Sequence, residues 1–294
     1  MSDGLRRMKF SIVTPSFRQP DWLRRCVRSV ADQGADVEHI IQDAGSGEEL
    51  EEWVRGNSHA RLFTEADSGM YDGLNRGLRR ATGEVCAWLN CDEQYLPGTL
   101  SAVAEVFARE PETDLVVGDW LITDPRGELL AFRRATRLRP AMIETDHLYD
   151  FTCAIFFRRR VLERGLWLRT DLRSAADGEW MCRVLRSGVR VAYLRRYLAT
   201  FTITGANVSA GAVADAESAQ LRAEAPWLVR TCAPVLRAAR HVEKWLAGGY
   251  RSGPITYEIY AGEEDRERTR FVCERPSFRH PWAGGGTSNI QSGE

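Results

Sequence analysis

The stretch EVCAWLNCDEQYLPGTL, residues 84–100, begins as an apolar run and then changes abruptly to polar residues. Residues 85–89 are all apolar, which is typical of a strand covered on both faces. The run stops at Asn90, and Asp92 and Glu93 follow directly. In open α/β sheets ligands bind beyond the carboxyl ends of the strands, so acids at this point predict a functional site.

Upstream of this stretch, strand and helix signals alternate along the chain. Short β-branched runs end at residues 14–16, at Asp43 and at residues 65–67, and each is followed by apolar residues at helical spacing. Downstream, residues 114–124 and 127–135 resemble two strands joined by a turn. This alternation predicts βαβ units, and therefore an α/β fold with a mixed sheet flanked by helices.

We expect three parts along the chain. Residues 1–210 carry the alternating pattern and would form one domain. Residues 211–282 begin alanine-rich and helical, which predicts a C-terminal helical extension with short strands. Residues 283–294, AGGGTSNIQSGE, predict a flexible tail.

Composition excludes several classes of protein. With 40 basic and 41 acidic side chains, the formal net charge is -1, which gives no general reason to expect nucleic acid as a partner. The seven cysteines form no CxxC pair, so neither a zinc ribbon nor a disulfide framework is indicated, and a reducing cytoplasm fits best. No window approaches the roughly 18 apolar residues of a membrane span. We expect a cytoplasmic protein, at most peripheral at the inner face of the membrane.

Two groups of polar residues admit both a functional and a structural interpretation. Asp92 and Glu93 could bind a hard divalent cation through their oxygens, or Asp92 could cap a solvated turn. Asp67, Asp72 and Asn75 crowd a loop and the first turn of a helix. Backbone N–H groups there attract anions and the side chains could bond sugar hydroxyls, but these residues could equally be a helix cap and an exposed helical residue.

A third candidate is Asp177, which stands directly before an amphipathic stretch that begins at Trp180. A carboxylate in this position is a good helix N-cap, and it could also serve as a general base. The residues by themselves leave both roles open.

Taken together, these segments resemble the family-2 glycosyltransferases of the bacterial surface-glycan type, which have the Rossmann-like GT-A fold. FSIVTPSFRQPDWLRRCVRSVADQ, IIQDAGSGE and EADSGMYDGLNRGLRRATGEVCAWLNCDEQYLPGTL are similar to motifs of that family, in the same order. FFRRRVLERG, DLRSAADGEWMCRVLRSG and TFTITGANVS continue the resemblance, which covers residues 9–209.

The resemblance implies roles for single residues. Asp92 would be the acid that binds Mn²⁺ or Mg²⁺, with Asn90 standing where the strictest family pattern has an aspartate. Asp177 would be the base that takes the proton of the acceptor hydroxyl in a single displacement with inversion. The residues implied to bind the nucleotide-sugar are Thr14, Pro15, Ser16, Asp43, Asp67, Asp72, Asn75 and Asn90.

We therefore expect an inverting glycosyltransferase that moves a hexosyl or N-acetylhexosaminyl group from a UDP-linked sugar to a glycan or lipid-linked acceptor. A sugar-nucleotide nucleotidyltransferase is the first alternative, disfavoured because TPSFRQPDW contains no glycine-rich basic phosphate loop. A non-catalytic nucleotide-sugar binding module is the second. The presence of both Asp92 and Asp177 argues against it.

The segment PWLVRTCAPVLRAARHVEKWLAGGY, residues 226–250, mixes apolar and basic residues. Such helices can lie in a membrane interface with their basic residues at the headgroups. Pro234 interrupts the apolar stripe, so we expect instead a helix pair that packs on the catalytic domain or on a second subunit of a homodimer. Any contact with anionic membranes should be weak and salt-sensitive.

Overall fold

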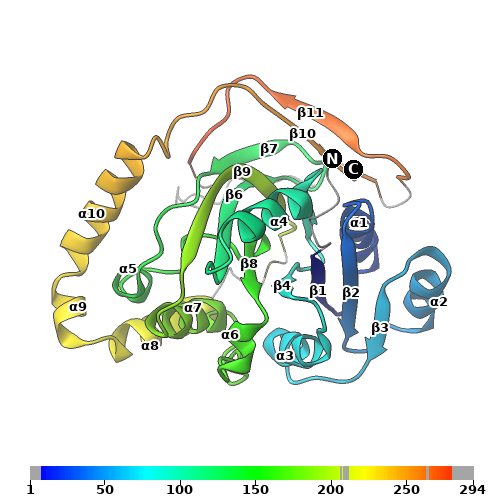
Figure 1. Cartoon of the computed structure of the whole chain (residues 1–294), viewed down its shortest axis with the longest axis horizontal. Coiled ribbons are helices and arrows are strands. Elements are labelled where there is room, and N and C mark those ends of the chain that lie inside the picture. The colour runs from blue at the N-terminus through cyan, green and yellow to red at the C-terminus, as the bar shows by residue number, and fades with distance from the viewer. Residues whose placement is uncertain (1–7, 206, 208–211, 263–264, 280–294) are drawn as a thin grey trace.

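The computed structural model describes residues 8–205, 207, 212–262 and 265–279, and a nine-stranded mixed sheet forms its centre (Figure 1). The tail expected at residues 283–294 lies outside the described residues. The strands of the sheet are β1 Lys9–Ser16, β2 Asp36–Asp43, β3 Arg61–Thr64, β4 Val85–Trp88, β5 Glu93–Tyr95, β6 Leu115–Thr123, β7 Leu129–Arg133, β8 Ile155–Arg158 and β9 Val191–Thr202.

Helices connect these strands and cover the sheet, as the alternating pattern predicted. They are α1 Pro20–Ala31, α2 Glu48–Asn57, α3 Met70–Arg80, α4 Thr99–Arg109, α5 Pro140–Glu144, the 3₁₀ turn η1 Thr152–Ala154, α6 Arg160–Glu163 and α7 Ala176–Arg186.

The sheet has the strand order β3-β2-β1-β4-β8-β6-β9-β5, with β7 paired to β6. β1 runs parallel to both β2 and β4, and β2 runs parallel to β3. β8 is antiparallel to β4 and β6, whereas β9 is parallel to β6. The predicted α/β fold with a mixed sheet flanked by helices is confirmed.

β4 shows why this sheet needs apolar residues on both faces. Val85 and Ala87 belong to the core that also contains Leu100 of α4, whereas Cys86 and Trp88 belong to the core that contains Leu74 of α3. Successive side chains of a strand point to opposite faces, so an all-apolar run is required where helices cover both. The expectation for residues 85–89 is confirmed.

The strand β5 is missing from the sequence-based expectations, which place residues 90–93 in a loop. Its three residues pair in antiparallel fashion with the end of β9. Glu93 and Gln94 are buried there, and so is Tyr95. A three-residue strand that contains an acid carries no periodic signal, so only the partner strand reveals it.

The C-terminal segment crosses back over the domain in helices and a hairpin: α8 Ala212–Glu224, α9 Trp227–Thr231, α10 Ala233–Leu246, β10 Ile255–Ile259 and β11 Thr269–Cys273 (Figure 1). Ile255, Tyr257 and Ile259 of β10 share an apolar cluster with Leu121 of β6 and Phe132 of β7. This packing ties the extension closely to the sheet. The domain boundary at residue 210 stays a prediction.

Helix α10 has its polar side toward the domain and its apolar side toward solvent. Arg240 donates to Asp146 Oδ2 at 2.5 Å, and Glu243 pairs with Arg139. Trp245 and Leu246 are 61% and 72% exposed. The helix does pack on the domain that contains the sheet, but through charged residues, and not through the apolar stripe that the sequence singled out.

None of the helices in the described ranges has both the length and the apolar character needed to cross a bilayer. All seven cysteines are free thiols, which agrees with the absence of a disulfide framework from the sequence pattern.

Candidate active site

A cavity of about 1390 Å³ lies beyond the carboxyl ends of the parallel strands and continues to the C-terminal helices. One end is lined by Pro15 and Ser16 of β1 and by the turn that follows β4. Asp177 lies on its wall, and α8 and α10 contribute to the other end. Residues that are distant in sequence therefore meet around one volume large enough for a nucleotide-sugar and an acceptor.

The turn after β4 is held by Glu93. One oxygen of its carboxylate accepts the backbone N–H of Asn90 at 2.7 Å, and the other accepts the Asn90 Nδ2 at 3.3 Å. Glu93 is 1% exposed, and burial raises the pKa of its carboxyl well above the usual range. Both oxygens of Glu93 are thus engaged in the turn, and Glu93 lines the cavity together with Asp92.

Asp92 is fixed from the far end of β9. Its Oδ2 accepts a hydrogen bond from Asn207 Nδ2 at 2.6 Å, and its backbone oxygen accepts the N–H of Thr202 at 3.0 Å. Burial raises the pKa of Asp92 to about 6. A carboxylate desolvated in this way gains from a nearby positive charge, because a cation favours its ionised form.

Asn90 and Asp92 could contribute two oxygen ligands to a divalent ion. Within the described ranges no group of three or more His, Cys, Asp or Glu side chains could hold a metal by itself. Asp92 offers a carboxylate, and the Oδ1 of Asn90 is buried without a hydrogen-bond partner among the described residues. Mg²⁺ commonly takes one or two carboxylates and completes its octahedral shell with phosphate oxygens and water.

Two further predicted residues line the cavity beside this turn. Ser16 is 5% exposed, and its Oγ has no partner in the part of the chain that is described. Asp67 Oδ1 accepts the N–H of Gly69 at 2.9 Å, which places its carboxylate on the wall at the start of α3. Gly69 has φ 136°, a conformation that favours glycine and lets the chain turn sharply there.

Four predicted residues do not line the cavity, and their side chains bond to the protein itself. Thr14 is fully buried and its Oγ1 bonds His39 Nε2 at 2.9 Å. Asp43 is buried as well, and its Oδ2 accepts hydrogen bonds from the backbone N–H groups of the turn after β2. Asp72 pairs with Arg76, and both amide atoms of Asn75 bond the backbone of Leu168.

The structure therefore separates the predicted site residues into two groups. Thr14, Asp43, Asp72 and Asn75 do not line the cavity. Those on the wall are Pro15, Ser16, Asp67, Asn90, Asp92 and Asp177.

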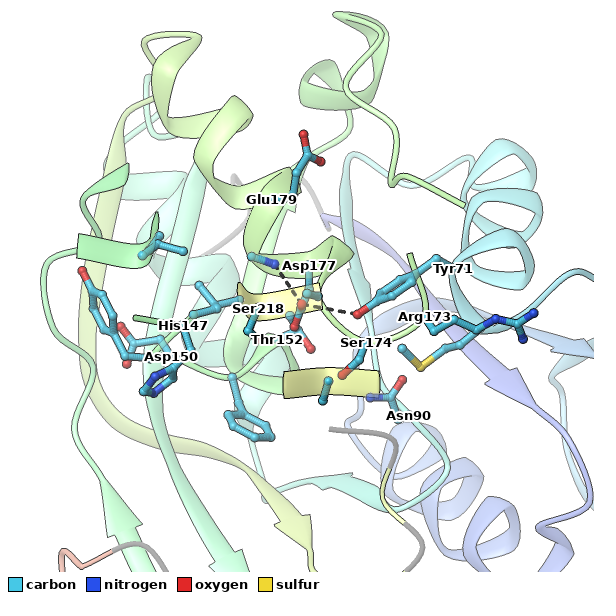
Figure 2. A pocket seen from close by; sticks show the side chains of 18 of the residues that line it. Tyr71, Asn90, His147, Asp150, Thr152, Arg173, Ser174, Asp177, Glu179 and Ser218 are labelled. Carbon is cyan, nitrogen blue, oxygen red and sulfur yellow. Dashed lines mark hydrogen bonds between the residues drawn. The ribbon is translucent and has the colours of Figure 1, made fainter. Parts of the chain in front are cut away.

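Asp177 lies in the first turn of α7, one residue inside the helix, so the alternative that it is the N-cap is wrong. Its Oδ1 accepts the Tyr71 hydroxyl at 3.3 Å and the Gly178 N–H at 2.8 Å (Figure 2). Burial raises the pKa of Asp177, and the hydrogen bond from Tyr71 opposes that rise. A partly desolvated carboxylate at a cavity wall is a suitable proton acceptor for a hydroxyl.

The loop in front of Asp177 is held by Glu217 of α8. Its carboxylate accepts the backbone N–H groups of Arg173, Ser174 and Ala175 at 2.7, 2.8 and 3.1 Å. Three successive donors on one carboxylate fix the backbone that leads into α7. Glu217 therefore fixes the segment that leads to Asp177, and it does not itself line the cavity.

Sequence reasoning missed Tyr71, Asn207 and Glu217. Tyr71 and Asn207 stand inside segments that resemble the family, GMYDGLNRG and TFTITGANVS, so these segments held a usable signal. Glu217 is an acid in an alanine-rich helix and its partners are backbone groups. No pattern in the sequence marks it.

Comparison with known proteins identifies the fold and the family. A family model described as glycosyl transferase family 2 matches residues 11–166, which is more than half of the chain. The chain belongs to glycosyl transferase family 2. The match spans β1 to α6, and so it includes the turn that carries Asn90 and Asp92 but ends before Asp177.

Two curated relatives illustrate the family at modest identity. An uncharacterized glycosyltransferase of Nostoc sp. is 25% identical over 217 residues, which are 68% of this chain and 66% of that protein. A PGL/p-HBAD biosynthesis glycosyltransferase of Mycobacterium bovis is 34% identical over 117 residues, 37% of this chain and 46% of that protein. The chain thus matches about half to two-thirds of the length of these family-2 relatives.

Solved structures show the same fold. The structure of residues 1–349 of S. aureus TarS in complex with UDP-GlcNAc has a TM-score of 0.56 and 14% identity, covering 89% of this chain and 99% of that one. The mannosyltransferase PcManGT of Pyrobaculum calidifontis, in complex with GDP-Man and Mn²⁺, has a TM-score of 0.50 and 17% identity, covering 84% and 77%. These similarities establish the Rossmann-like GT-A fold for this member of family 2.

Proposed function

We propose that the chain is an inverting glycosyltransferase that moves a sugar from a UDP-linked donor to a hydroxyl of a glycan or glycolipid acceptor. The observation that carries the proposal is the shared cavity. Asp177, a desolvated carboxylate, lines the same volume as the Asn90–Asp92 turn, whose oxygens fit a diphosphate-bound cation. Membership of family 2 disfavours a sugar-nucleotide nucleotidyltransferase.

The donor would lie at the end of the cavity formed by β1, β4 and α3. Pro15 and Ser16 would contact the nucleoside, and the buried Ser16 Oγ would gain the hydrogen-bond partner that it lacks among the described residues. Asp67 would bond hydroxyls of the ribose or the sugar. A UDP donor is supported by the fold neighbour whose structure contains UDP-GlcNAc, and the choice between hexosyl and N-acetylhexosaminyl transfer is left to experiment.

The diphosphate would lie at Asn90 and Asp92, where Asp92 would hold Mn²⁺ or Mg²⁺. A bound cation of this kind supplies Lewis-acid stabilisation of the negative charge on the departing phosphate, a contribution of several kcal/mol. Asn207 keeps the Asp92 carboxylate oriented, and Glu93 keeps the turn in shape.

The acceptor hydroxyl would lose its proton to Asp177. Tyr71 and the Gly178 N–H hold the carboxylate in one orientation. The hydrogen bonds from the backbone of residues 173–175 to Glu217 fix the loop that precedes α7. In a single displacement the acceptor hydroxyl attacks one face of the anomeric carbon while the phosphate departs from the other. Asp177 and the Asn90–Asp92 turn line one cavity, so one side chain could take the proton while the turn holds the diphosphate, and inversion is part of this proposal.

The test is a binding and turnover panel on the whole chain. UDP, GDP and their sugars are titrated calorimetrically with Mn²⁺, with Mg²⁺ and with EDTA, and release of the nucleoside diphosphate is followed in parallel. We expect metal-dependent UDP binding with slow hydrolysis of a UDP-sugar. Preference for GDP would correct the base, whereas tight binding without any turnover, with acceptors supplied, would favour a non-catalytic binding module.

A further inference from the structure

The end of the cavity away from the donor turn contains two cations that form no ion pair within 4 Å with a carboxylate of the described residues. Arg133 ends β7, Lys244 lies on α10, and both line the cavity. Neither has an ion pair within 4 Å in the described part of the chain, and the buried Nε of Arg133 lacks any hydrogen-bond partner there. Both residues are half-buried, and a partly desolvated cation gains from a nearby negative charge, so this arrangement favours the binding of an anion.

The remaining contacts of these two cations are weak. Arg133 Nη1 reaches the backbone oxygen of Phe278 at 3.5 Å, and its guanidinium lies 5.9 Å from the Trp120 ring centroid. Lys244 Nζ lies 5.4 Å from the Tyr250 ring centroid. Apart from the contact of Arg133 Nη1 with Phe278, the described residues supply no acceptor to these N–H donors, which could meet a ligand with several oxygens.

A third cation, Arg240, belongs to the same end but is already engaged, because it donates to Asp146 at 2.5 Å. Asp150 is the acid that interacts electrostatically with both Arg133 and Lys244. Its Oδ2 accepts the Thr136 N–H at 3.2 Å, and burial raises its pKa to about 7. Even when Asp150 is ionised, it is one acid beside two cations, so this end of the cavity keeps an excess of positive charge.

The electrostatics of Lys244 point the same way. Burial, together with the nearby guanidinium of Arg133, lowers the pKa of Lys244 to about 8. A lysine surrounded by too few negative charges loses its proton more easily, and binding of an anion would reverse this effect. The ammonium is still mostly protonated at neutral pH.

We propose that this basic end, defined by Arg133, Arg240 and Lys244, binds a phosphate group carried by the acceptor. A guanidinium fork and an ammonium together match the tetrahedral oxygens of a phosphate, which carries up to two negative charges. The same cavity continues from here to Asp177, so a ligand anchored by its phosphate would reach the base with a hydroxyl. This inference rests on the proposed function and names the acceptor class: a phosphate-bearing glycan or lipid.

Geometry separates this subsite from the donor phosphates. The donor turn follows β4 near the middle of the sheet, whereas α10 lies on the side of the molecule away from β1 to β3 (Figure 1). Saturating UDP with Mg²⁺ would therefore occupy the donor turn and leave the basic end open.

The experiment uses the whole chain saturated with UDP and Mg²⁺, and inorganic phosphate is titrated at constant ionic strength. Phosphorus NMR resolves the phosphate signal from those of UDP, so line broadening of the added phosphate reports binding at a second site. A short-chain, monomeric phosphatidic acid forms a second arm, which separates a phosphate recognised by itself from one recognised together with lipid.

We expect saturable binding in the wild type and a loss of roughly tenfold or more in affinity for Lys244→Gln, the usual effect of removing a charged hydrogen-bond partner. Arg133→Gln should act in the same direction. Arg251→Gln removes an exposed arginine of the same extension that does not line the cavity, and it is the matched control. UDP binding by each variant reports whether the fold and the donor site are intact.

Absence of saturable phosphate binding in a wild type that binds UDP would overturn the subsite and leave the proposed function standing. Phosphate binding that is unchanged in both Lys244→Gln and Arg133→Gln would overturn it as well. Failure of the wild type to bind any nucleoside diphosphate would instead refute the proposed function, and that result is obtained before phosphate is added.

Discussion

Asp177 is the side chain on which the proposed chemistry most directly depends. For Asp177→Asn we expect unchanged UDP affinity and a turnover ~10²- to 10⁴-fold lower, the usual contribution of a general base. Asparagine keeps the shape of the side chain and can still accept from Tyr71, so the fold should survive. Release of UDP from a UDP-sugar measures the rate, and Asp171→Asn at an exposed position is the control. Turnover equal to the wild type would leave Asp177 a purely structural residue.

Tyr71 should set the pH range in which that base works. Its hydroxyl stabilises the ionised form of Asp177 and so lowers the pKa of the carboxyl, against the rise caused by burial. In Tyr71→Phe the pKa of Asp177 should rise, and the acidic limb of kcat/KM should move to higher pH by roughly one unit. Above this limb the rate should be nearly restored. A pH profile of both proteins checks this, and a limb that moves to lower pH would contradict it.

Asp92 should account for the metal dependence of donor binding. For Asp92→Ala we expect UDP affinity in Mn²⁺ to fall more than ~10-fold, to the level seen in EDTA, because the diphosphate loses its bridging ion. Calorimetry with and without Mn²⁺ measures the difference. Circular dichroism confirms folding. Metal-dependent UDP binding that survives this substitution would remove the metal assignment.

At the scale of elements, α8 controls the loop that precedes α7. Glu217→Gln keeps one acceptor oxygen where the carboxylate supplied two, so it should loosen residues 173–175. We expect turnover to fall roughly tenfold, with UDP affinity unchanged, since misplacing a reacting group by about 1 Å is costly. The effect on kcat without an effect on donor affinity separates positioning from general destabilisation.

The control for this helix is Asp215→Asn, an exposed acid two residues earlier on α8. Its turnover should match the wild type. Partial recovery in Glu217→Asp, which keeps the charge on a shorter arm, would strengthen the assignment. If Glu217→Gln and Asp215→Asn had the same turnover, the hydrogen bonds of Glu217 to residues 173–175 would have no role in catalysis.

At the scale of the whole molecule, the apolar residues of α9 and α10 face outward. The exposed fractions of Trp227 and Leu228 are 66% and 56%, and those of Trp245 and Leu246 are 61% and 72%. Arg240 and Lys244 are directed to the cavity, which leaves few basic residues of this surface to meet lipid headgroups. We propose that the surface makes a weak peripheral contact with membranes.

We expect weak, salt-sensitive binding to anionic vesicles, since each basic residue near a lipid surface contributes about 1 kcal/mol and is screened by salt. The double variant Trp245→Ser and Leu246→Ser should reduce it. Co-sedimentation at low and high salt is the measurement. Binding that stays tight in high salt would contradict the prediction, and a concentration-dependent dimer abolished by the double variant would assign the surface to a second subunit.

The sequence determined most helices and strands of the sheet, β5 excepted, and the edge of the sheet at which the cavity lies. The all-apolar run at residues 85–89 requires cover on both faces, and the acids after it fall where parallel strands open to ligands. These inferences succeed because strand and helix periodicity, and the chemistry of strand ends, are local properties of a few neighbouring residues. Pro15, Ser16, Asn90 and Asp92 were found in this way, together with the resemblance to the family.

Only the tertiary structure decided which of these side chains meet. The side chains of Thr14 and Asn75 are buried within the protein, whereas Ser16 lines the cavity. Asn207 donates a hydrogen bond to Asp92, although 115 residues separate them in the chain. Glu217 could not be predicted, because its partners are backbone N–H groups, which every residue except proline provides and no pattern marks. The strand order, the docking of α10 and the unpaired cations beside it likewise depend on contacts between distant segments, which local periodicity does not encode.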